Sequence, residues 1–446
     1  MAELTPVRFP AGFLWGAATS AHQVEGGNRW NDWWSFEHRA PDLPATHRSG
    51  EACRHWELFD RDFALAAADA HNAHRLSLEW SRIEPERGRH DGDAIAHYHD
   101  VFASLRGHGL TPIVTLFHFT LPLWVAAAGG WESRETLGRF CDFARFCARE
   151  FGGEVDWWCT MNEPEVYAFR GWSEGIWPPG KHDDGLALEV VANQLEAHGR
   201  AYRILHDEDR ADADGDGVPA RVGFAKHVVQ LEPLRGWSPL DQLRAFLEDR
   251  VFNEAVIEAP RSGEIRLSIP GAKAVRRHVP ELADSLDWFG LNYYTRWMVD
   301  GLGREPHVLR PGAPANDLGW EIYPEGLVRA VERVGRGERP VLITEHGVAD
   351  AADRARPRAL VESLVRLGGA VARGARVIGY LHWSLMDNFE WADGFAGRFG
   401  LYRVPFERDA GLRERTRSAG LLARIARVNA VEADVLAETA APRPAS

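Results

Sequence analysis

The sequence has few of the features that would place a protein in a membrane or on a nucleic acid. No apolar run approaches the roughly 20 residues that a membrane-spanning helix needs. The N-terminus from Met1 to Pro6 has no basic region and no apolar core, so it does not read as a signal peptide. Basic clusters are lacking, and a formal net charge of −13 disfavours nucleic acid or an anionic membrane surface as a partner.

Cysteine is also scarce. The chain has only four, Cys53, Cys141, Cys147 and Cys159, and they are not spaced in zinc-type pairs. Three of them lie in apolar segments typical of helices or strands. We therefore expect buried thiols of a reducing compartment and a cytoplasmic protein, with no disulfide framework. No grouping of residues in the sequence indicates a metal ion or another cofactor.

The composition is that of an ordinary globular protein, with 45% hydrophobic and 26% charged residues. Its 446 residues could form one large domain or two or three of average size. Eight apolar, strand-like runs lie along the chain, at residues 13–17, 73–80, 112–117, 155–159, 222–225, 286–292, 341–345 and 377–383. Helical periodicity marks segments between them, at about 57–70, 94–106, 135–151 and 186–205, and from Pro357 onward.

Alternating strands and helices predict an α/β protein with a parallel sheet. Eight such units without a linker predict a single-domain (β/α)8 TIM barrel over residues 1–436, with insertions in the βα loops. We place the insertions at about residues 24–55 and 228–284, and we expect a disordered tail over 437–446. An open doubly wound sheet is the alternative, but no Gly-rich dinucleotide turn follows the first strand.

One acidic segment, residues 212–217, is similar to the start of an EF-hand calcium loop. The twelfth position of that loop requires a bidentate Glu, and this chain has Gly223 there. We therefore interpret the segment as a solvated acidic turn before the fifth strand.

Two of the predicted strands end in glutamate. The fourth leads into Thr160-Met161-Asn162-Glu163-Pro164, and the seventh ends in Thr344-Glu345. In a (β/α)8 barrel, catalytic groups lie at the carboxyl ends of the strands, so both side chains are expected at one rim. Two such carboxyl groups, one protonated and one ionised, suit the cleavage of a glycosidic bond.

Other polar and aromatic residues are expected at the same rim. They are Gln23, His118, Asn162, Asn292, Tyr294, Trp383 and the segment 387–391. Amide, imidazole and carboxylate groups bind sugar hydroxyls, and flat aromatic rings pack against the apolar face of a pyranose. The rim therefore has the composition of a sugar-binding site.

The motifs together resemble glycoside hydrolase family 1, the retaining β-glucosidase and β-galactosidase family, and most of all its archaeal-type branch. The resemblance covers about residues 9–408. It rests on residues 13–20 with Gln23-Val24-Glu25-Gly26, on 75–83, 160–164, 290–294 and 343–347, and on the segment from Trp383 to Trp391.

The resemblance implies the roles of individual residues. Glu163 matches the acid/base and Glu345 the nucleophile. Tyr294 matches a tyrosine that donates to the nucleophile, Arg75 a cation beneath it, and Asn292 is expected to support the site. The positions that match the sugar-binding site are Gln23, His118, Asn162, Glu390 and Trp391, with Trp383 as a stacking platform and Phe399 as a ring at the mouth.

We therefore predict a retaining exo-β-glycosidase that removes a terminal glucose, galactose or fucose through a covalent glycosyl-enzyme. Its two carboxyl groups are expected about 5–5.5 Å apart. Glu390 argues against a phosphorylated sugar, because a carboxylate repels phosphate. Glu163 argues against a thioglucosidase of the myrosinase kind, in which the resemblance implies Gln at that position.

Two departures from the family pattern leave alternatives open. His346 follows the nucleophile where the family usually has Asn, and it either perturbs Glu345 or only replaces a packed polar residue. The chain has His118-Phe119-Thr120-Leu121-Pro122 where His-Trp-Asp-Leu-Pro is common in the family.

The role of His227 is also open. It ends the fifth strand, and it either reaches the leaving group or is a core histidine.

Two other functions remain as alternatives. One is a transglycosidase that moves sugar to an alcohol or lipid acceptor, because residues 118–131 resemble the plant galactolipid-remodelling branch. The other is a non-catalytic sugar-binding relative, which typically lacks one of the two carboxylates that this chain has. The preferred sugar, the leaving group and the oligomeric state do not follow from the sequence.

Overall fold

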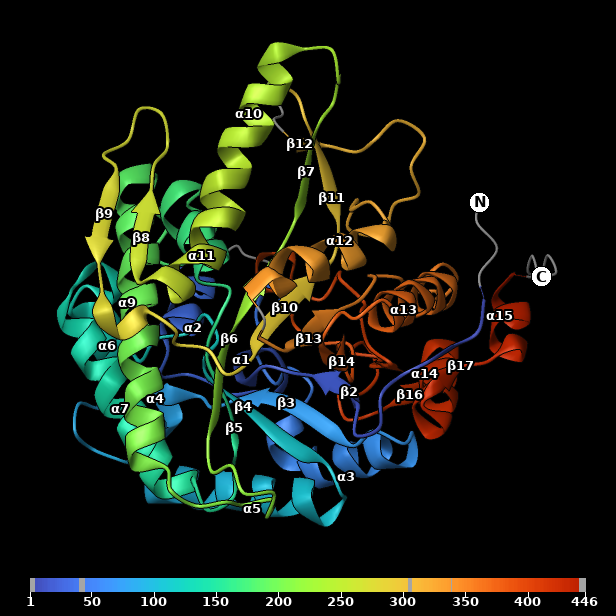
Figure 1. The fold of residues 1–446 in the computed structure, drawn as a ribbon. Coiled ribbons are helices and arrows are strands. Elements are labelled where there is room, and N and C mark those ends of the chain that lie inside the picture. The colour runs from blue at the N-terminus through green and yellow to red at the C-terminus, as the bar shows by residue number, and fades with distance from the viewer. Residues whose placement is uncertain (1–4, 40–44, 304–306, 338, 441–446) are drawn as a thin grey trace.

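Eight parallel strands close into a barrel (Figure 1), in a computed structural model that describes residues 5–39, 45–303, 307–337 and 339–440. The strands are β2 (Leu14–Ala18), β3 (Ala73–Ser77), β4 (Thr111–Phe117), β5 (Trp157–Asn162), β6 (Arg221–His227), β10 (Phe289–Tyr293), β13 (Val341–His346) and β14 (Val377–Trp383). Each pairs with the next in chain order, and β14 pairs with β2. The predicted (β/α)8 barrel is confirmed.

Helices connect these strands and cover the outside of the barrel (Figure 1). The main ones are α3 (His55–Ala68), α5 (Gly92–Gly107), α7 (Glu135–Phe151), α9 (Asp184–Glu208), α11 (Ala255–Ser262), α12 (Glu325–Val334), α13 (Arg356–Ala372) and α14 (Arg417–Val428). The predicted helices match α3, α5, α7, α9 and α13 closely. Side chains set some of the boundaries: Asp183 caps α9 by accepting the backbone N–H of Leu186.

The barrel interior is a packed core. A buried cluster fills it, made of Ala73, Ile113, Cys159, Ala225, Trp288, Leu342 and Leu381. Arg75 and Thr115 follow Ala73 and Ile113 by two positions, so they point the same way, one layer nearer the carboxyl ends. The polar residues of the rim therefore lie directly above an apolar layer of the barrel interior.

The insertions lie where the sequence placed them. The segment 24–55 carries α2 (Asp32–Glu37), and its residues 40–44 lie outside the described part of the chain. The segment 228–284 carries β7 (Gln230–Pro233), α10 (Pro239–Asp249), α11, β8 (Glu264–Leu267) and β9 (Val275–His278). In Figure 1, α10 and β7 project beyond the barrel at the top of the view.

A third insertion was not predicted. It follows β10 and contains β11 (Arg296–Val299) and β12 (His307–Val308), which form a small sheet with β7. These strands are too short to show a period in the sequence.

The second predicted strand, residues 73–80, was too long. The strand β3 ends at Ser77, and Trp80 begins the short helix α4 (Trp80–Ile83).

The two ends of the chain meet. The strand β1 (Val7–Arg8) pairs antiparallel with β17 (Ala430–Val431), and α15 (Ala433–Ala440) follows. The prediction of a disordered tail over 437–446 is therefore wrong for residues 437–440, which continue a helix. Residues 441–446 lie outside the described part of the chain.

The acidic segment before β6 is a turn in which carboxylate side chains accept hydrogen bonds from backbone N–H groups of the same segment. Carboxylate oxygens of Asp156, Asp212 and Asp214 lie within 4.8 Å of one another. Asp212 accepts the N–H groups of Gly215 and Gly217, each at 2.8 Å. Arg221 pairs with Asp216 and lies 3.8 Å from Asp214, so it supplies positive charge to the turn.

All four cysteines are buried free thiols, as the sequence predicted. Among the helices that the structure describes, none is both long and apolar enough to pass through a bilayer.

Candidate active site

Glu345 lies near the carboxyl end of β13, and each oxygen of its side chain has its own donor. Nη1 of Arg75 donates to Oε1 at 2.6 Å, and the hydroxyl of Tyr294 donates to Oε2 at 2.6 Å. Arg75 is itself buried and fixed, because its other nitrogens donate to Thr115 at 3.0 Å and to Asn162 at 2.7 Å. The contacts predicted for Arg75 and Tyr294 are confirmed.

Opposing forces act on the ionisation of Glu345. Burial raises the pKa of its carboxyl, Arg75 lowers it, the nearby Glu163 raises it, and the Tyr294 hydroxyl lowers it. The balance leaves the pKa of Glu345 above its usual value. Its ionised form therefore depends on the two donors that hold it.

Glu163 follows β5 directly and precedes the helix α8 (Pro164–Ala168). Nδ2 of Asn292 donates to its Oε1 at 2.7 Å, and Nδ1 of His227 lies 3.4 Å from the same oxygen. Burial raises the pKa of Glu163, but His227 and Asn292 lower it, and the result lies below the usual value. The contact between His227 and Glu163 was not predicted from the sequence.

The backbone is strained where this site is built. Glu163, Phe119 and Trp391 have φ angles of 42°, 72° and 55°, in the left-handed region that non-glycine residues rarely adopt. Such conformations cost on the order of 1 kcal/mol or more each and gather where the surrounding structure fixes side chains for function.

Asn162 is the hub between these groups. Its Oδ1 accepts from Arg75 at 2.7 Å and from Asn292 at 3.1 Å, which directs its Nδ2 toward Nε2 of His118 at 3.2 Å. Burial lowers the pKa of His118 well below its usual value, so this imidazole is neutral. Asn162, His118, Arg75 and Asn292 therefore form one connected network with the two glutamates.

Glu390 lies on the loop after β14. Nε1 of Trp383 donates to its Oε1 at 3.0 Å, and Nε2 of Gln23 lies 3.5 Å from its Oε2. Burial raises the pKa of Glu390 to about 8. Gln23 is fully buried, and its amide also donates to Asn388 at 2.9 Å and to the carbonyl of Phe389 at 2.7 Å. Gln23 therefore holds this loop as well as reaching Glu390.

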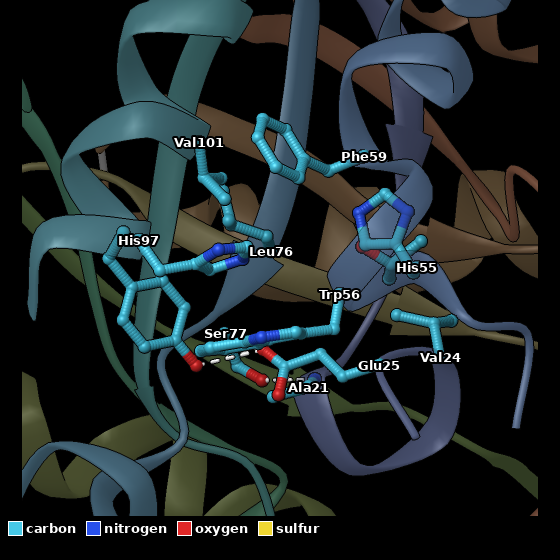
Figure 2. Close-up of a pocket in the computed structure, with 12 residues that line it drawn as sticks. Ala21, Val24, Glu25, His55, Trp56, Phe59, Leu76, Ser77, His97 and Val101 are labelled. Carbon is cyan, nitrogen blue, oxygen red and sulfur yellow. Dashed lines mark hydrogen bonds between the residues drawn. The ribbon is translucent and has the colours of Figure 1, made fainter. Parts of the chain in front are cut away.

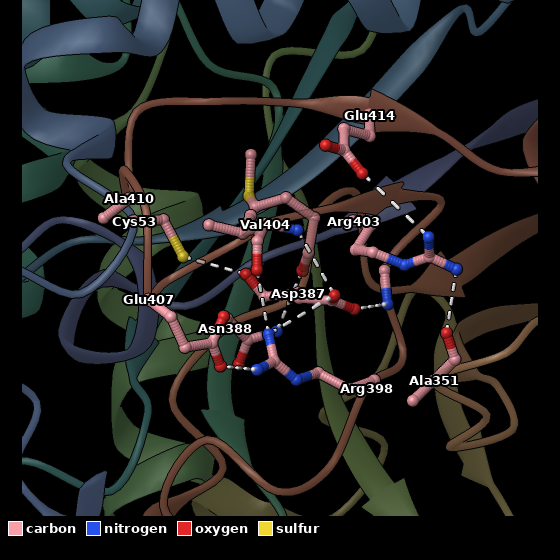
Figure 3. A network of polar contacts seen from close by, with 12 residues as sticks. Cys53, Ala351, Asp387, Asn388, Arg398, Arg403, Val404, Glu407, Ala410 and Glu414 are labelled. Carbon is pink, nitrogen blue, oxygen red and sulfur yellow. Dashed lines mark hydrogen bonds and ion pairs between the residues drawn. The ribbon is translucent and has the colours of Figure 1, made fainter.

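A polar network at Asp387 fixes the same loop (Figure 3). Asp387 accepts the N–H groups of Gly400 at 2.9 Å and Val404 at 3.3 Å, and Arg398 lies 3.6 Å from its carboxylate. The thiol of Cys53 donates to the carbonyl of Asp387 at 2.9 Å. The segment 387–391 is therefore anchored on its far side, which positions Glu390 and Trp391.

Trp391 belongs to an aromatic wall. Its ring stacks on His22 with centroids 5.7 Å apart and an angle of 10°, and lies 4.7 Å from Trp33 and 5.3 Å from Phe119. His118 also lies parallel to Trp391, at 6.1 Å. His22 is thus a packing residue behind the wall.

The expectation for Phe399 needs correction. Its ring is 1% exposed and packs with Trp383, while Tyr294 and Trp320 lie against it at 5.9 Å and 6.1 Å. Phe399 therefore lies behind the site instead of forming a ring at its mouth. Trp320, which packs against Phe399 and Tyr294, is half-buried, and it was not predicted because it lies in an irregular segment.

His346, the departure from the family motif, faces away from Glu345. Its Nδ1 lies 2.8 Å from the hydroxyl of Tyr380, and its ring is parallel to Tyr293 at 6.2 Å. Burial lowers the pKa of His346 to about 4, so it is neutral near pH 7. These contacts favour the interpretation of a packed polar residue.

Glu25, also part of a motif, holds the first βα loop. Its carboxylate accepts from the hydroxyl of Tyr98 and from Nε of Arg82, both at 2.8 Å. Glu25, Trp56 and Ser77 line a cavity of about 20 Å³, and Figure 2 shows these side chains close together. This space is large enough for one water molecule. Glu25 is thus separate from the paired carboxyl groups.

A larger cavity of about 540 Å³ is lined by residues of the segments 32–39, 121–132 and 167–181, among them Phe36, Leu121, Tyr167 and Lys181. Tyr167, which lines this cavity, stacks on Phe119 of the aromatic wall at 6.1 Å.

The barrel and its buried carboxyl groups are typical of enzymes that cleave glycosidic bonds. The chain matches the family model of glycosyl hydrolase family 1 over residues 5–431. It is 30% identical to a beta-galactosidase from Pyrococcus woesei, over 89% of this chain and 92% of that protein. It is 31% identical to beta-glucosidase A from Thermotoga maritima, over 90% and 94%.

A solved beta-glycosidase from Pyrococcus horikoshii has a TM-score of 0.87 and 34% identity, and the match covers 98% of this chain and 99% of that one. The chain belongs to glycosyl hydrolase family 1 and is an O-glycosyl hydrolase.

Proposed function

We propose that this protein is a retaining exo-β-glycosidase that hydrolyses terminal β-linked sugars by double displacement. The observation that carries the proposal is the pair of buried carboxyl groups at the ends of β5 and β13, each with its own set of donors. The charge of Glu163 raises the pKa of Glu345, so the buried pair titrates together and favours one shared negative charge. We place that charge on Glu345, because Arg75 donates directly to it.

In the first step, a carboxylate oxygen of Glu345 attacks the anomeric carbon, and the bond to the leaving oxygen breaks. Glu163 donates its proton to that oxygen, so the leaving group departs as an alcohol. Arg75 and Tyr294 favour the ionised form of Glu345 that this attack requires.

In the second step, the Glu163 carboxylate takes a proton from water. The water oxygen attacks the same carbon and displaces Glu345, which regains its negative charge. Glu345 is neutral while it is esterified to the sugar, so it no longer raises the pKa of Glu163. Each attack inverts the anomeric carbon, and two inversions give retention.

We propose that the sugar lies against Trp383 and Trp391, with its hydroxyls bound by His118, Asn162, Gln23 and Glu390. Glucose, galactose and fucose all suit such a set. A 6-phosphate does not, because the Glu390 carboxyl is neutral or negative and gives the phosphate no cation.

The test is hydrolysis of a panel of aryl β-glycosides by the wild type, Glu345→Gln and Glu163→Ala. We expect Glu345→Gln to lose about 10⁴-fold or more in kcat with every sugar. Glu163→Ala should regain turnover of an activated aryl glycoside when azide is added, because azide replaces the water that needs a base. A kcat of Glu345→Gln equal to that of the wild type would contradict the proposal. Phosphorylated and unphosphorylated glycosides compared on the same panel test the role of Glu390.

A further inference from the structure

His227, the last residue of β6, lies beside the proposed acid/base. Its Nδ1 is 3.4 Å from Oε1 of Glu163, and its side chain is 16% exposed. The ring lies 5.7 Å from Tyr294 and meets the edge of Phe252 at 6.0 Å. Both rings restrict its orientation, so the imidazole nitrogen stays directed at the carboxyl group.

The two oxygens of Glu163 have different surroundings. Oε1 accepts from Nδ2 of Asn292 at 2.7 Å and also faces His227. The orientation of Asn292 follows from Thr344, whose hydroxyl donates to the other side of the amide at 2.6 Å. Among the residues that the structure describes, none donates a hydrogen bond to Oε2 of Glu163.

We propose that His227 is a positioning residue whose Nδ1–H donates to Oε1 of Glu163 and leaves Oε2 as the oxygen that carries the transferable proton. A carboxylic acid with both donors on one oxygen binds its proton on the other. The proton is then presented to the leaving oxygen in a single orientation, which is what general acid catalysis needs. This inference rests on the proposed role of Glu163.

The neighbouring cation, Lys226, does not take the place of His227 at Glu163. Lys226, the residue before it on β6, points away and pairs with Glu165 on α8 at 2.7 Å, and both side chains are fully buried. Nζ of Lys226 also donates to the backbone carbonyl of His227, which fixes the end of the strand. The titratable groups around the imidazole are Glu163 and Glu165 from α8 and its start, Lys226 from β6, Tyr294 after β10 and Glu345 from β13.

Removing the donor has a definite sign. A hydrogen bond to Oε1 favours the ionised form of Glu163, so its loss raises the pKa of this carboxyl. The alkaline limb of kcat/KM, which reports the protonated acid, then moves to higher pH. For one hydrogen bond to a charged group, the expected movement is about one pH unit.

The experiment compares His227→Leu with His227→Asn. Leucine removes the donor, whereas the amide nitrogen of asparagine can take the place of Nδ1 and keep it. Phe252→Leu is the matched control, because it loosens the packing of the ring without removing a donor. Each protein is assayed from pH 4 to 10 with methyl and dinitrophenyl β-glycosides of the preferred sugar, after its thermal unfolding has been recorded.

For His227→Leu we expect the alkaline limb to move up and kcat/KM to fall about tenfold with the methyl glycoside, whose leaving group needs a proton. With the dinitrophenyl glycoside, which leaves unaided, kcat/KM should stay within about twofold. His227→Asn should restore the wild-type limb. Equal losses on both substrates with an unmoved limb, or the same profile in Phe252→Leu, would overturn the inference.

This result is distinguishable from failure of the proposed function. If azide rescues Glu163→Ala but the His227 variants leave the limb unmoved, only the role of His227 is wrong. If azide does not rescue Glu163→Ala, the assignment of Glu163 itself is wrong.

Discussion

At the scale of single residues, Glu345 shows how burial and hydrogen bonding act against each other. The side chain is 5% exposed, which disfavours its charge, and two short hydrogen bonds at 2.6 Å favour it. Arg75 carries a permanent positive charge and is itself buried, so the pair is stable only while both partners are present. Tyr294 contributes a neutral donor, which makes it the simpler of the two to remove.

The variant Tyr294→Phe tests this balance. The loss of its hydroxyl raises the pKa of Glu345, so the acidic limb of kcat/KM, which reports the ionised nucleophile, should move up by about one pH unit. We also expect kcat/KM at its optimum to fall about tenfold or more. The measurement is a pH profile with an activated aryl glycoside.

Tyr293→Phe provides the matched control for this variant. Tyr293 is the adjacent residue, and its hydroxyl donates to the carbonyl of Tyr323 at 2.8 Å, away from Glu345. It should lose stability without moving the limb. If both variants have the wild-type pH profile, Tyr294 does not act on the ionisation of Glu345.

His346 can be tested by restoring the residue that is usual in the family. We expect His346→Asn to keep kcat/KM within about threefold, because His346 contacts Tyr380 and not Glu345. Loss of the contact with the Tyr380 hydroxyl should cost about 1 kcal/mol in the free energy of unfolding. Tyr380→Phe should show a similar loss, and a shifted pH profile in His346→Asn would contradict this interpretation.

The sequence identified both glutamates because each ends an apolar run that reads as a strand. It identified Arg75 and Tyr294 through the family resemblance, and the structure confirms their contacts with Glu345. It missed the position of Phe399, since burial behind Trp383 depends on how a long loop folds back. It left His227 undecided, because the contact with Glu163 joins different strands of the barrel.

At the scale of elements, continuous apolar runs separated by helical segments predicted all eight barrel strands. Such runs are typical of parallel strands that are buried on both faces. The helices α3, α5, α7, α9 and α13 were also predictable to within a few residues from their periodicity. The small sheet of β7, β11 and β12 was not, since its strands are short and are defined by each other, not by a local pattern. Insertions of this kind depend on contacts between distant segments.

The cap of α5 offers a test of helix stability away from the site. One oxygen of Asp91 accepts the N–H groups of Asp93 at 3.0 Å and Ala94 at 3.1 Å. Asp91→Ala should cost about 1 kcal/mol, and for a chain of this size we expect the melting temperature to fall by about 1–2 °C. Activity at lower temperature should not change.

Asp93→Ala is the control for this helix. It removes a carboxylate from the same turn, where the charge acts through the helix dipole, so it should cost about half as much or less. Equal losses of melting temperature in both variants would show that charge, and not the cap, stabilises the start of α5.

At the scale of the whole molecule, the chain closes on itself twice. The barrel closes where β14 meets β2, and the termini meet where β1 pairs with β17. The rim that carries Glu163 and Glu345 is therefore supported by elements from the entire sequence. This explains why Arg75 and Glu345, which are 270 residues apart in the sequence, approach to 2.6 Å.

The most direct test of the account is the configuration of the first product. Wild-type protein is incubated with an aryl β-glycoside that it hydrolyses, and the anomeric proton of the released sugar is followed by NMR before mutarotation. Two displacements at one carbon predict that the β-anomer appears first and the α-anomer only later. Initial release of the α-anomer would mean a single displacement by water, and Glu345 could not then be the nucleophile.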